Sequence, residues 1–322
     1  MGGKILACSL TAAALAFLST IPVRVAAQEK ETPKVPQRPH LDDPNYYDRD
    51  AAHDAPYAEK YKAEAKAKTD TRMKAALAKP TPHATDGHPD LNGIWVSAGG
   101  GLPVIISPDG KERKVLFGPF PNGKPGPVAP PMPPNQPSYK PELQQKVERL
   151  WIDQTHQDPT AYTCKNPGVP RIGAPDQIVQ TAGQVVFLYK QGLAGGNPSS
   201  TFRVIPTDGR SHRADADPTV MGDSIGRWVE GTLIVDVTHL DDSTWFDRFG
   251  NFHSDAMHVT ERLTRKGDTL QYTATVEDPQ VLTKPWTSNP VTRVLGGSED
   301  ALPADYPCID NDSRHLEGLE HF

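Results

Sequence analysis

Side chains that can titrate or contact a ligand are concentrated between residues 219 and 285 of this 322-residue chain. Imidazole exchanges protons near neutral pH, and a neighbouring carboxylate can fix its tautomer, so histidine and acid together suit acid–base chemistry. Indole rings add flat apolar surface for a bound molecule. We therefore expect any functional site to lie here, among Asp223, Trp228, Asp236, His239, Asp241, Asp242, Trp245, Asp247, His253, Asp255 and His258.

Acid–base catalysis is the first hypothesis for this set. His258 is a candidate general base, oriented by Asp236 or Asp255, and His253 is a second candidate base. The chemistry would be proton transfer, as in hydration, elimination or isomerisation by a lyase or an isomerase. The alternative is a noncatalytic binding or scaffold protein, in which these histidines only hydrogen-bond loop backbone.

A metal site is another alternative. His212 and His253, together with an aspartate from residues 241–247, have the ligand types of a divalent metal site. His253 and His258 do not fit the helical HExxH motif, because a strand does not bring residues five apart onto one face. A metal-dependent hydrolase remains an alternative, and the sequence assigns no metal ligand and no cofactor.

The predicted ligand-binding residues are Trp228, Trp245, Asp223 and Arg171. Indole faces bordered by carboxylates suit a carbohydrate-like or other amphipathic small molecule. Trp228 could instead plug one end of a sheet, and Arg171 could pair with an internal acid. Ser224 lies in a Gly-x-Ser-x-Gly match, but a strand follows it rather than the helix of a nucleophile elbow, so Ser224 is not predicted to be a nucleophile.

The elements that position these side chains are predicted to be strands. Residues 232–237 and 270–276 alternate between apolar and polar side chains, which is the pattern of half-buried strands. Residues 257–264 alternate less cleanly, because Glu261 falls on the apolar parity. Glycine-containing turns between these runs predict an antiparallel meander.

Shorter runs extend the β-rich pattern towards the N-terminus. They predict strands or hairpins at 94–96, 104–106 with 115–117, 178–180 with 184–189, and 202–205. Helical spacing is confined to 58–78 and 141–151, which we expect to be peripheral helices, and the chain after Pro285 is expected to be irregular. Strands that follow one another without alternating helices exclude a doubly wound sheet.

The predicted domain organisation has three parts. Residues 1–27 combine Lys4, an apolar run and a small-residue cleavage sequence, so they are predicted to be a signal peptide. Residues 28–86 form a polar N-terminal extension with the first helix, and residues 87–322 form a single β-rich domain with a proline-rich insertion at 119–141. Removal of the leader leaves no stable membrane span in this prediction, and we expect a periplasmic or secreted protein.

Charge and cysteine content narrow the expected partners. The net charge is −6 without a basic run, which argues against nucleic acid, since phosphate binding needs clustered Lys and Arg. Of three cysteines, Cys8 lies in the predicted leader, and we expect a disulfide between Cys164 and Cys308 in an oxidising compartment. A small-molecule ligand is the expected partner, and the oligomeric state is left open.

Several longer motifs are distinctive in combination. They are DLNGIW at 90–95, CKNPGVPR at 164–171, GDSIGRW and EGTLIVDV within 222–237, HSDAMHVTERL at 253–263 and EDPQVLTKPWT at 277–287. On these motifs the chain resembles a large group of exported bacterial β-rich proteins with no assigned function. The resemblance implies a barrel-like sheet of the calycin or lipocalin type. With the strand pattern it predicts a mainly β fold, an antiparallel meander that closes into a barrel with a pocket at one mouth and peripheral helices.

Overall fold

The computed structural model describes residues 63–64, 66–98, 104–106, 112–114, 134–152, 157–160, 163–190 and 201–300. All of these residues belong to one unit of the chain, residues 45–322. The predicted signal peptide, the first part of the polar extension, most of the proline-rich insertion and Cys308 lie outside the described residues. The predictions for those segments, including the disulfide to Cys164, stay predictions.

Most of the described chain folds into one antiparallel sheet. Its strands are β1 (Gly93–Ser97), β4 (Gln177–Gln180), β5 (Gln184–Tyr189), β6 (Thr201–Pro206), β7 (Asp223–Val229), β8 (Thr232–Thr238), β9 (His258–Lys266), β10 (Thr269–Glu277), β11 (Trp286–Thr287) and β12 (Val291–Leu295). Their order is β6, β5, β4, β1, β12, β10, β9, β8 and β7, and β11 pairs with β10. A separate hairpin pairs β2 (Val104–Ile106) with β3 (Glu112–Lys114), rather than with the predicted 115–117.

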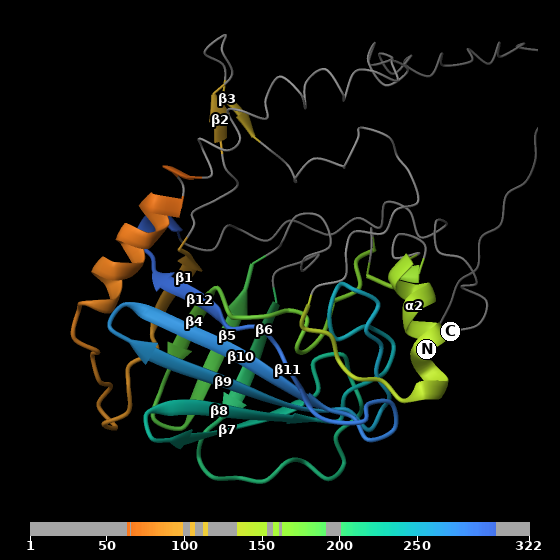
Figure 1. Cartoon of the computed structure of the whole chain (residues 1–322). Helices are drawn as coiled ribbons and strands as arrows, with labels where there is room; N and C mark the ends of the chain where they lie inside the picture. The colour runs from red at the N-terminus through yellow and green to blue at the C-terminus, as the bar shows by residue number, and fades with distance from the viewer. Residues whose placement is uncertain are drawn as a thin grey trace, which may run out of the picture. The chain divides into compact units, whose positions relative to one another are not determined.

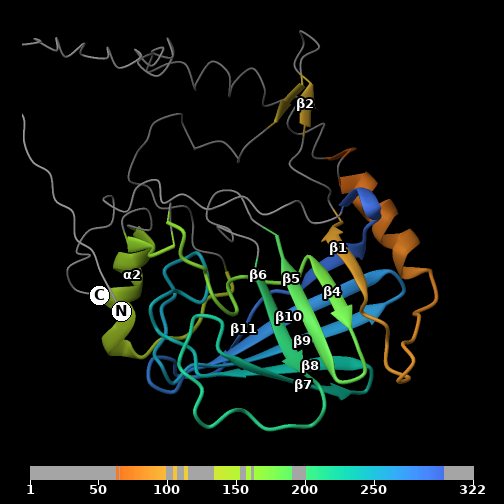
Figure 2. The same cartoon turned by 180° about the vertical axis from the view of Figure 1, so that it is seen from behind.

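The sheet curls until its two outermost strands meet. β6 and β7, at opposite ends of the strand order, lie against each other. Figures 1 and 2 show β4, β5 and β6 crossing over the layer formed by β8, β9 and β10. Closing a sheet on itself leaves few free strand edges. The structure therefore confirms the predicted mainly β fold with a barrel-like antiparallel sheet.

A glycine and a side-chain bridge shape the seam between β6 and β7. A Cβ at Gly226 would lie 2.9 Å from Cγ2 of Thr207 and 3.0 Å from Cγ2 of Ile205, closer than side chains normally pack. Glycine therefore allows the two strands to approach at this point. Further along β7, Nη2 of Arg203 donates to Oγ of Ser224 at 2.7 Å and so bridges the seam.

Two strands differ from the predictions. A strand is expected only after the Gly-x-Ser-x-Gly match, but β7 begins at Asp223 and so includes Ser224 and the second glycine of the match, Gly226. The expectation of an irregular chain after Pro285 is wrong, because β12 pairs with both β1 and β10. Val294 is the fully buried residue of β12, so this strand lacks the alternation that marks a strand in sequence. β12 is formed by its pairing with strands that are distant in sequence.

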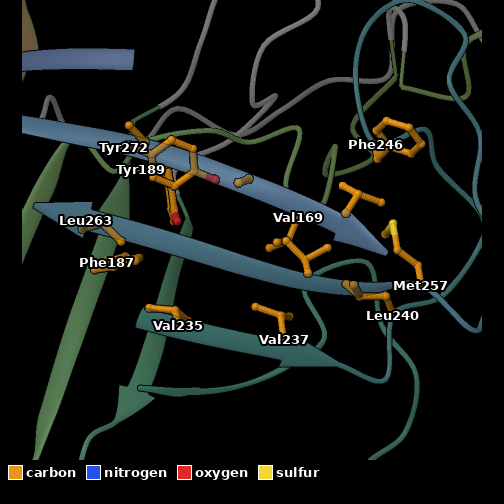
Figure 3. Close-up of a cluster of buried hydrophobic side chains, with 14 of the residues drawn as sticks. Val169, Phe187, Tyr189, Val235, Val237, Leu240, Phe246, Met257, Leu263 and Tyr272 are labelled. Carbon is orange, nitrogen blue, oxygen red and sulfur yellow. The ribbon is translucent and has the colours of Figure 1, made fainter. Parts of the chain in front are cut away.

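The interior of the barrel is filled with apolar side chains. Alternate residues of the strands point inward: Val235 and Val237 on β8 are completely buried, whereas Asp236 between them is part-exposed. Figure 3 shows side chains from β5, β8, β9 and β10 gathered with loop residues in one core. Removing this apolar surface from water is the main source of stability for such a fold.

Helices lie at the periphery, as predicted. Residues 66–77 are helical, and Lys79 just after this helix lies with its Nζ 2.6 Å from Oδ2 of Asp268 in the β9–β10 turn. The helix α2 (Gln144–Ile152) buries one face, formed by Val147, Leu150 and Trp151. Short 3-10 turns occur at η1 (Pro141–Leu143) and η2 (Ser298–Asp300). In the described part of the chain, no helix combines the length and apolar character needed to cross a membrane.

A charged pair is buried inside the barrel. The side chains of Arg203 on β6 and Glu261 on β9 are 4% and 0% exposed, and Nη2 lies 2.7 Å from Oε2. Tyr272 donates to the other Glu261 oxygen at 2.9 Å, and Arg203 donates to the hydroxyl of Tyr189 at 3.3 Å. Because an isolated buried charge is costly, each charged partner depends on the other, and the pair ties β6 to β9 across the interior.

Glu261→Gln removes the negative partner and leaves the Arg203 charge buried. We expect it to lower the free energy of unfolding by about 3–5 kcal/mol, the usual cost of breaking a buried pair. Urea unfolding followed by tryptophan fluorescence measures the loss, with Glu148→Gln on the exposed face of α2 as the matched control. A loss below about 1 kcal/mol, the level of a surface pair, would contradict this role.

Candidate functional site

A row of histidines and carboxylates lies on the outer face of β7 to β10. Strand register brings its members together: His258 stands two residues before Thr260, the partner of Asp236, and Glu277 pairs directly with His258. A further histidine, from the loop between β6 and β7, reaches the same face. We call this set the histidine–carboxylate chain; it consists of Asp223, His212, Asp236, His258 and Glu277.

The contacts of the histidine–carboxylate chain run in order from Asp223 to Glu277. Nδ1 of His212 lies 2.8 Å from Oδ2 of Asp223, and its Nε2 lies 3.0 Å from Oδ2 of Asp236. Oδ1 of Asp236 lies 2.5 Å from Nε2 of His258, whose Nδ1 is 3.3 Å from Oε2 of Glu277. One carboxylate, Asp236, thus holds two imidazole rings, and the contact to Glu277 is the longest of the four.

Each ring nitrogen of His212 and His258 faces a carboxylate. A neutral imidazole carries a single N–H, so both contacts of one ring are hydrogen bonds only when the ring carries two protons. Arg213 also donates to Asp223, with Nε 2.9 Å from Oδ1. With both rings protonated, two imidazolium groups and one guanidinium balance three carboxylates.

The two inner carboxylates are held in their charged form. Burial raises the pKa of Asp236, but hydrogen bonds from His212 and His258 outweigh burial and bring this pKa below its usual value. Burial also raises the pKa of Asp223, and hydrogen bonds from His212 and Arg213 again bring it below the usual value. A charged carboxylate that only accepts is the group that orients an imidazole for acid–base chemistry.

Two predicted catalytic residues lie outside this chain. His253 is 5% exposed, its Nδ1 lies 3.0 Å from the carbonyl oxygen of Ser254, and burial lowers its pKa, which favours the neutral ring. Asp255 is exposed and accepts a 3.3 Å hydrogen bond from Gln280. Among the predicted catalytic residues, the structure therefore brings His258 to Asp236, and it does not bring His253 to Asp255.

Three predicted binding residues make contacts within the protein. Trp228 stacks on His88, with ring centroids 4.7 Å apart and 5° between the planes. Trp245 is buried in the loop after β8. Arg171 donates through both Nη atoms to Asp158, at 3.0 and 2.6 Å, which is the internal pairing considered as its alternative. None of the three lines the cavities described below.

A cavity of about 360 Å³ lies at the seam between β6 and β7, and we call it the seam cavity. Part of its wall is apolar, and two of these side chains, Phe202 and Val204, are 66% and 45% exposed. The remaining wall is polar and includes Arg203, Arg213, Ser224 and Asp223. Asp223 therefore belongs both to the seam cavity and to the histidine–carboxylate chain.

Another cavity, of about 300 Å³, lies beside the β4–β5 turn and is lined by Asp90, Asn92 and Gln180 among others. It lies at an end of the barrel, where the sequence predicts a pocket, but the predicted site residues do not line it. Within the described ranges, no three histidine, cysteine, aspartate or glutamate side chains are arranged to hold one metal ion. The geometry thus gives no support to the metal-dependent alternative.

Several residues of the site are absent from the sequence-based prediction. Arg203 carries a signal that could have identified it, because it lies two residues before buried Ile205 and therefore on the inward-facing side of the predicted strand. Glu261 likewise lies on the inward-facing side of its own strand. Arg213 comes from a loop and Glu277 from the last position of a strand. Periodicity does not distinguish such positions from ordinary solvated charges.

Comparison with known proteins adds no assignment. The chain matches no protein-family model, no curated protein and no solved structure. The resemblance to exported β-rich proteins stays an expectation, and the functional argument rests on the geometry of the site.

Asp236→Asn tests the histidine–carboxylate chain through pH. Because the folded pKa of Asp236 lies below its usual value, its charged form stabilises the fold above about pH 4, and this contribution is lost as the pH falls through the folded pKa. We expect Asp236→Asn to lower the free energy of unfolding by about 1–3 kcal/mol at pH 5.5, and by much less at pH 3. Urea unfolding at both pH values measures this.

The control for this experiment is Asp255→Asn, which changes an exposed carboxylate with a single long hydrogen bond. We expect no difference from the unchanged protein at either pH. A loss for Asp236→Asn that is equal at pH 5.5 and pH 3 would show that its charge does not contribute to the fold.

Proposed function

We propose that this protein is exported and binds a small amphipathic molecule in the seam cavity. The observation that supports this proposal is the mixed wall, in which the exposed apolar residues Phe202 and Val204 line the same cavity as the buried residue Arg203. A volume of about 360 Å³ is at the lower end of the range for small-molecule sites. The apolar residues of such a wall can contact the body of a ligand, and its polar residues can orient the ligand's polar group.

The position of the seam cavity also favours ligand binding. The interior of the barrel is filled by Trp95, Phe187, Tyr189 and other large side chains, so a ligand has room at the seam rather than inside the barrel. Exposed apolar side chains such as Phe202 lose contact with water when a ligand covers them. Burial of these apolar side chains would therefore favour the binding of a ligand in the cavity.

Val204→Trp should block the seam cavity. The substitution places a large side chain at the cavity wall, on a residue that is 45% exposed, so the core is not changed. We expect the neutral fluorescent probe N-phenyl-1-naphthylamine to bind the unchanged protein and to bind Val204→Trp at least about tenfold more weakly, which corresponds to about 1.4 kcal/mol. Fluorescence titration measures both affinities.

Val229→Trp is the matched control, because Val229 on β7 is 41% exposed and does not line the seam cavity. We expect it to bind the probe like the unchanged protein. Equal probe affinity in both tryptophan variants, or no probe binding at all, would contradict a ligand site at the seam.

A second candidate function is acid–base catalysis by His258 and Asp236. It is favoured by the short contact between Asp236 and Nε2 of His258, together with the longer 3.3 Å contact of Nδ1 to half-exposed Glu277. Nε2–H would donate to Asp236, which fixes the ring. A substrate would take the place of Glu277, and unprotonated Nδ1 would accept its proton. The reaction class is then hydration, elimination or isomerisation, and the noncatalytic binding protein is its rival.

His258→Gln separates catalysis from binding. If the dyad is catalytic, we expect turnover on a panel of hydration, elimination and isomerisation substrates to fall at least about 100-fold, as for the loss of a general base. The free energy of unfolding should change by less than about 1 kcal/mol, because the residue is partly exposed. Unchanged turnover would contradict the assignment of the base to His258, and a panel without any turnover would favour the noncatalytic rival.

His253→Gln is the contrasting variant for this experiment. His253 is buried and hydrogen-bonds backbone, so its substitution should lower the free energy of unfolding without a specific effect on turnover per folded molecule. Loss of turnover in a stable His253→Gln variant would place the base there and contradict the assignment to His258.

A further inference from the structure

We infer that the seam cavity selects molecules that carry a carboxylate, and that Arg203 is the residue that binds it. This inference rests on the proposed ligand-binding function and names the chemical class of the ligand. It comes from the distribution of hydrogen-bond donors around the cavity.

Arg203 has donors that the protein does not use. Its Nη2 contacts both Oγ of Ser224 and Oε2 of Glu261 at 2.7 Å, and Nη1 contacts the hydroxyl of Tyr189 at 3.3 Å. Nε is buried, and within the described residues it has no acceptor. The side chain is 4% exposed and yet lines the seam cavity. A buried donor without a partner costs free energy, which a ligand oxygen would recover.

The rest of the polar wall also favours an acceptor as ligand. Arg203, Arg210 and Arg213 line the cavity together with one aspartate, Asp223. Arg213 pairs with Asp223 and Arg210 pairs with Asp208, so the wall offers guanidinium donors rather than an excess of positive charge. Glu261 balances Arg203 from the interior side, and Ser224, which accepts from Arg203, keeps its own O–H as a donor. Guanidinium groups recognise carboxylates with strong, charge-assisted hydrogen bonds.

The apolar wall determines the remainder of the ligand. Phe202, Val204 and Met221 line the same cavity as the arginines. A carboxylate at Arg203 would therefore be followed by an apolar body at the seam, as in a medium-chain fatty acid or an aryl-alkanoic acid. A small, fully polar acid would leave this wall uncovered.

Displacement of N-phenyl-1-naphthylamine by octanoate and by octanamide tests the inference. The two molecules share a chain and differ in the charge of the head group. We expect octanoate to displace the probe at a concentration at least about tenfold lower than octanamide. In the double variant Arg203→Met with Glu261→Gln, which removes both buried charges together, we expect this ratio to fall to about one. Because the ratio compares two ligands in the same variant, a change in probe affinity does not affect it.

The outcomes distinguish this inference from the proposed function. Equal displacement by octanoate and octanamide in the unchanged protein overturns carboxylate selectivity and leaves the ligand site intact. Loss of the preference in Arg213→Gln, with the preference kept in the double variant, overturns the role of Arg203. If Val204→Trp does not weaken probe binding, the ligand site itself fails, and the inference fails with it. If the double variant does not fold, the octanoate preference is compared between the unchanged protein and Arg213→Gln. A preference that Arg213→Gln keeps supports Arg203, and a preference that it loses contradicts the role of Arg203.

Discussion

The buried pair of Arg203 and Glu261 is the constraint on which the rest of the structure depends. It joins β6 to β9 across an interior that is otherwise apolar, with a contact of 2.7 Å between two almost fully buried side chains. Neither charge is tolerable alone in such surroundings, so the two strands must stay in place together. The same guanidinium also reaches Ser224 on β7. One residue therefore links the interior, the seam and the seam cavity.

The alternation of β-strands separates two kinds of polar chemistry on β7 to β9. Side chains of one parity form the interior network around Glu261, whereas those of the other parity form the outer histidine–carboxylate chain around Asp236. Two adjacent residues of β7 belong to different networks. Ser224 contacts Arg203 of the interior network, and Asp223 contacts His212 of the outer histidine–carboxylate chain. Because both residues line the seam cavity, a bound ligand would lie beside the interior arginine and beside the Asp223 end of the histidine–carboxylate chain.

Much of the fold follows from the sequence, but only part of the site does. The strands that carry clean alternation, such as β8 and β10, and the helix around Val147 are predictable from periodicity alone. β12 is not, because its pairing with β1 and β10 joins distant parts of the chain. His258 and Asp236 could be paired from strand register. His212 could be proposed only as a metal ligand, since a loop residue gains its partners from tertiary packing, which periodicity does not encode.

A charged residue at an inward-facing position of a strand is the signal that could have identified the buried pair from the sequence. Glu261 breaks the apolar alternation of its strand, and Arg203 occupies an inward-facing position two residues before buried Ile205. In the structure the two residues form a buried pair, and beside it lies an unused donor. The most direct test of this account is the ¹H–¹⁵N resonance of the Arg203 side-chain Nε, followed by NMR during titration with octanoate. We expect a saturable shift with octanoate and little change with octanamide. An Nε resonance that stays fixed while octanoate binds would contradict the account.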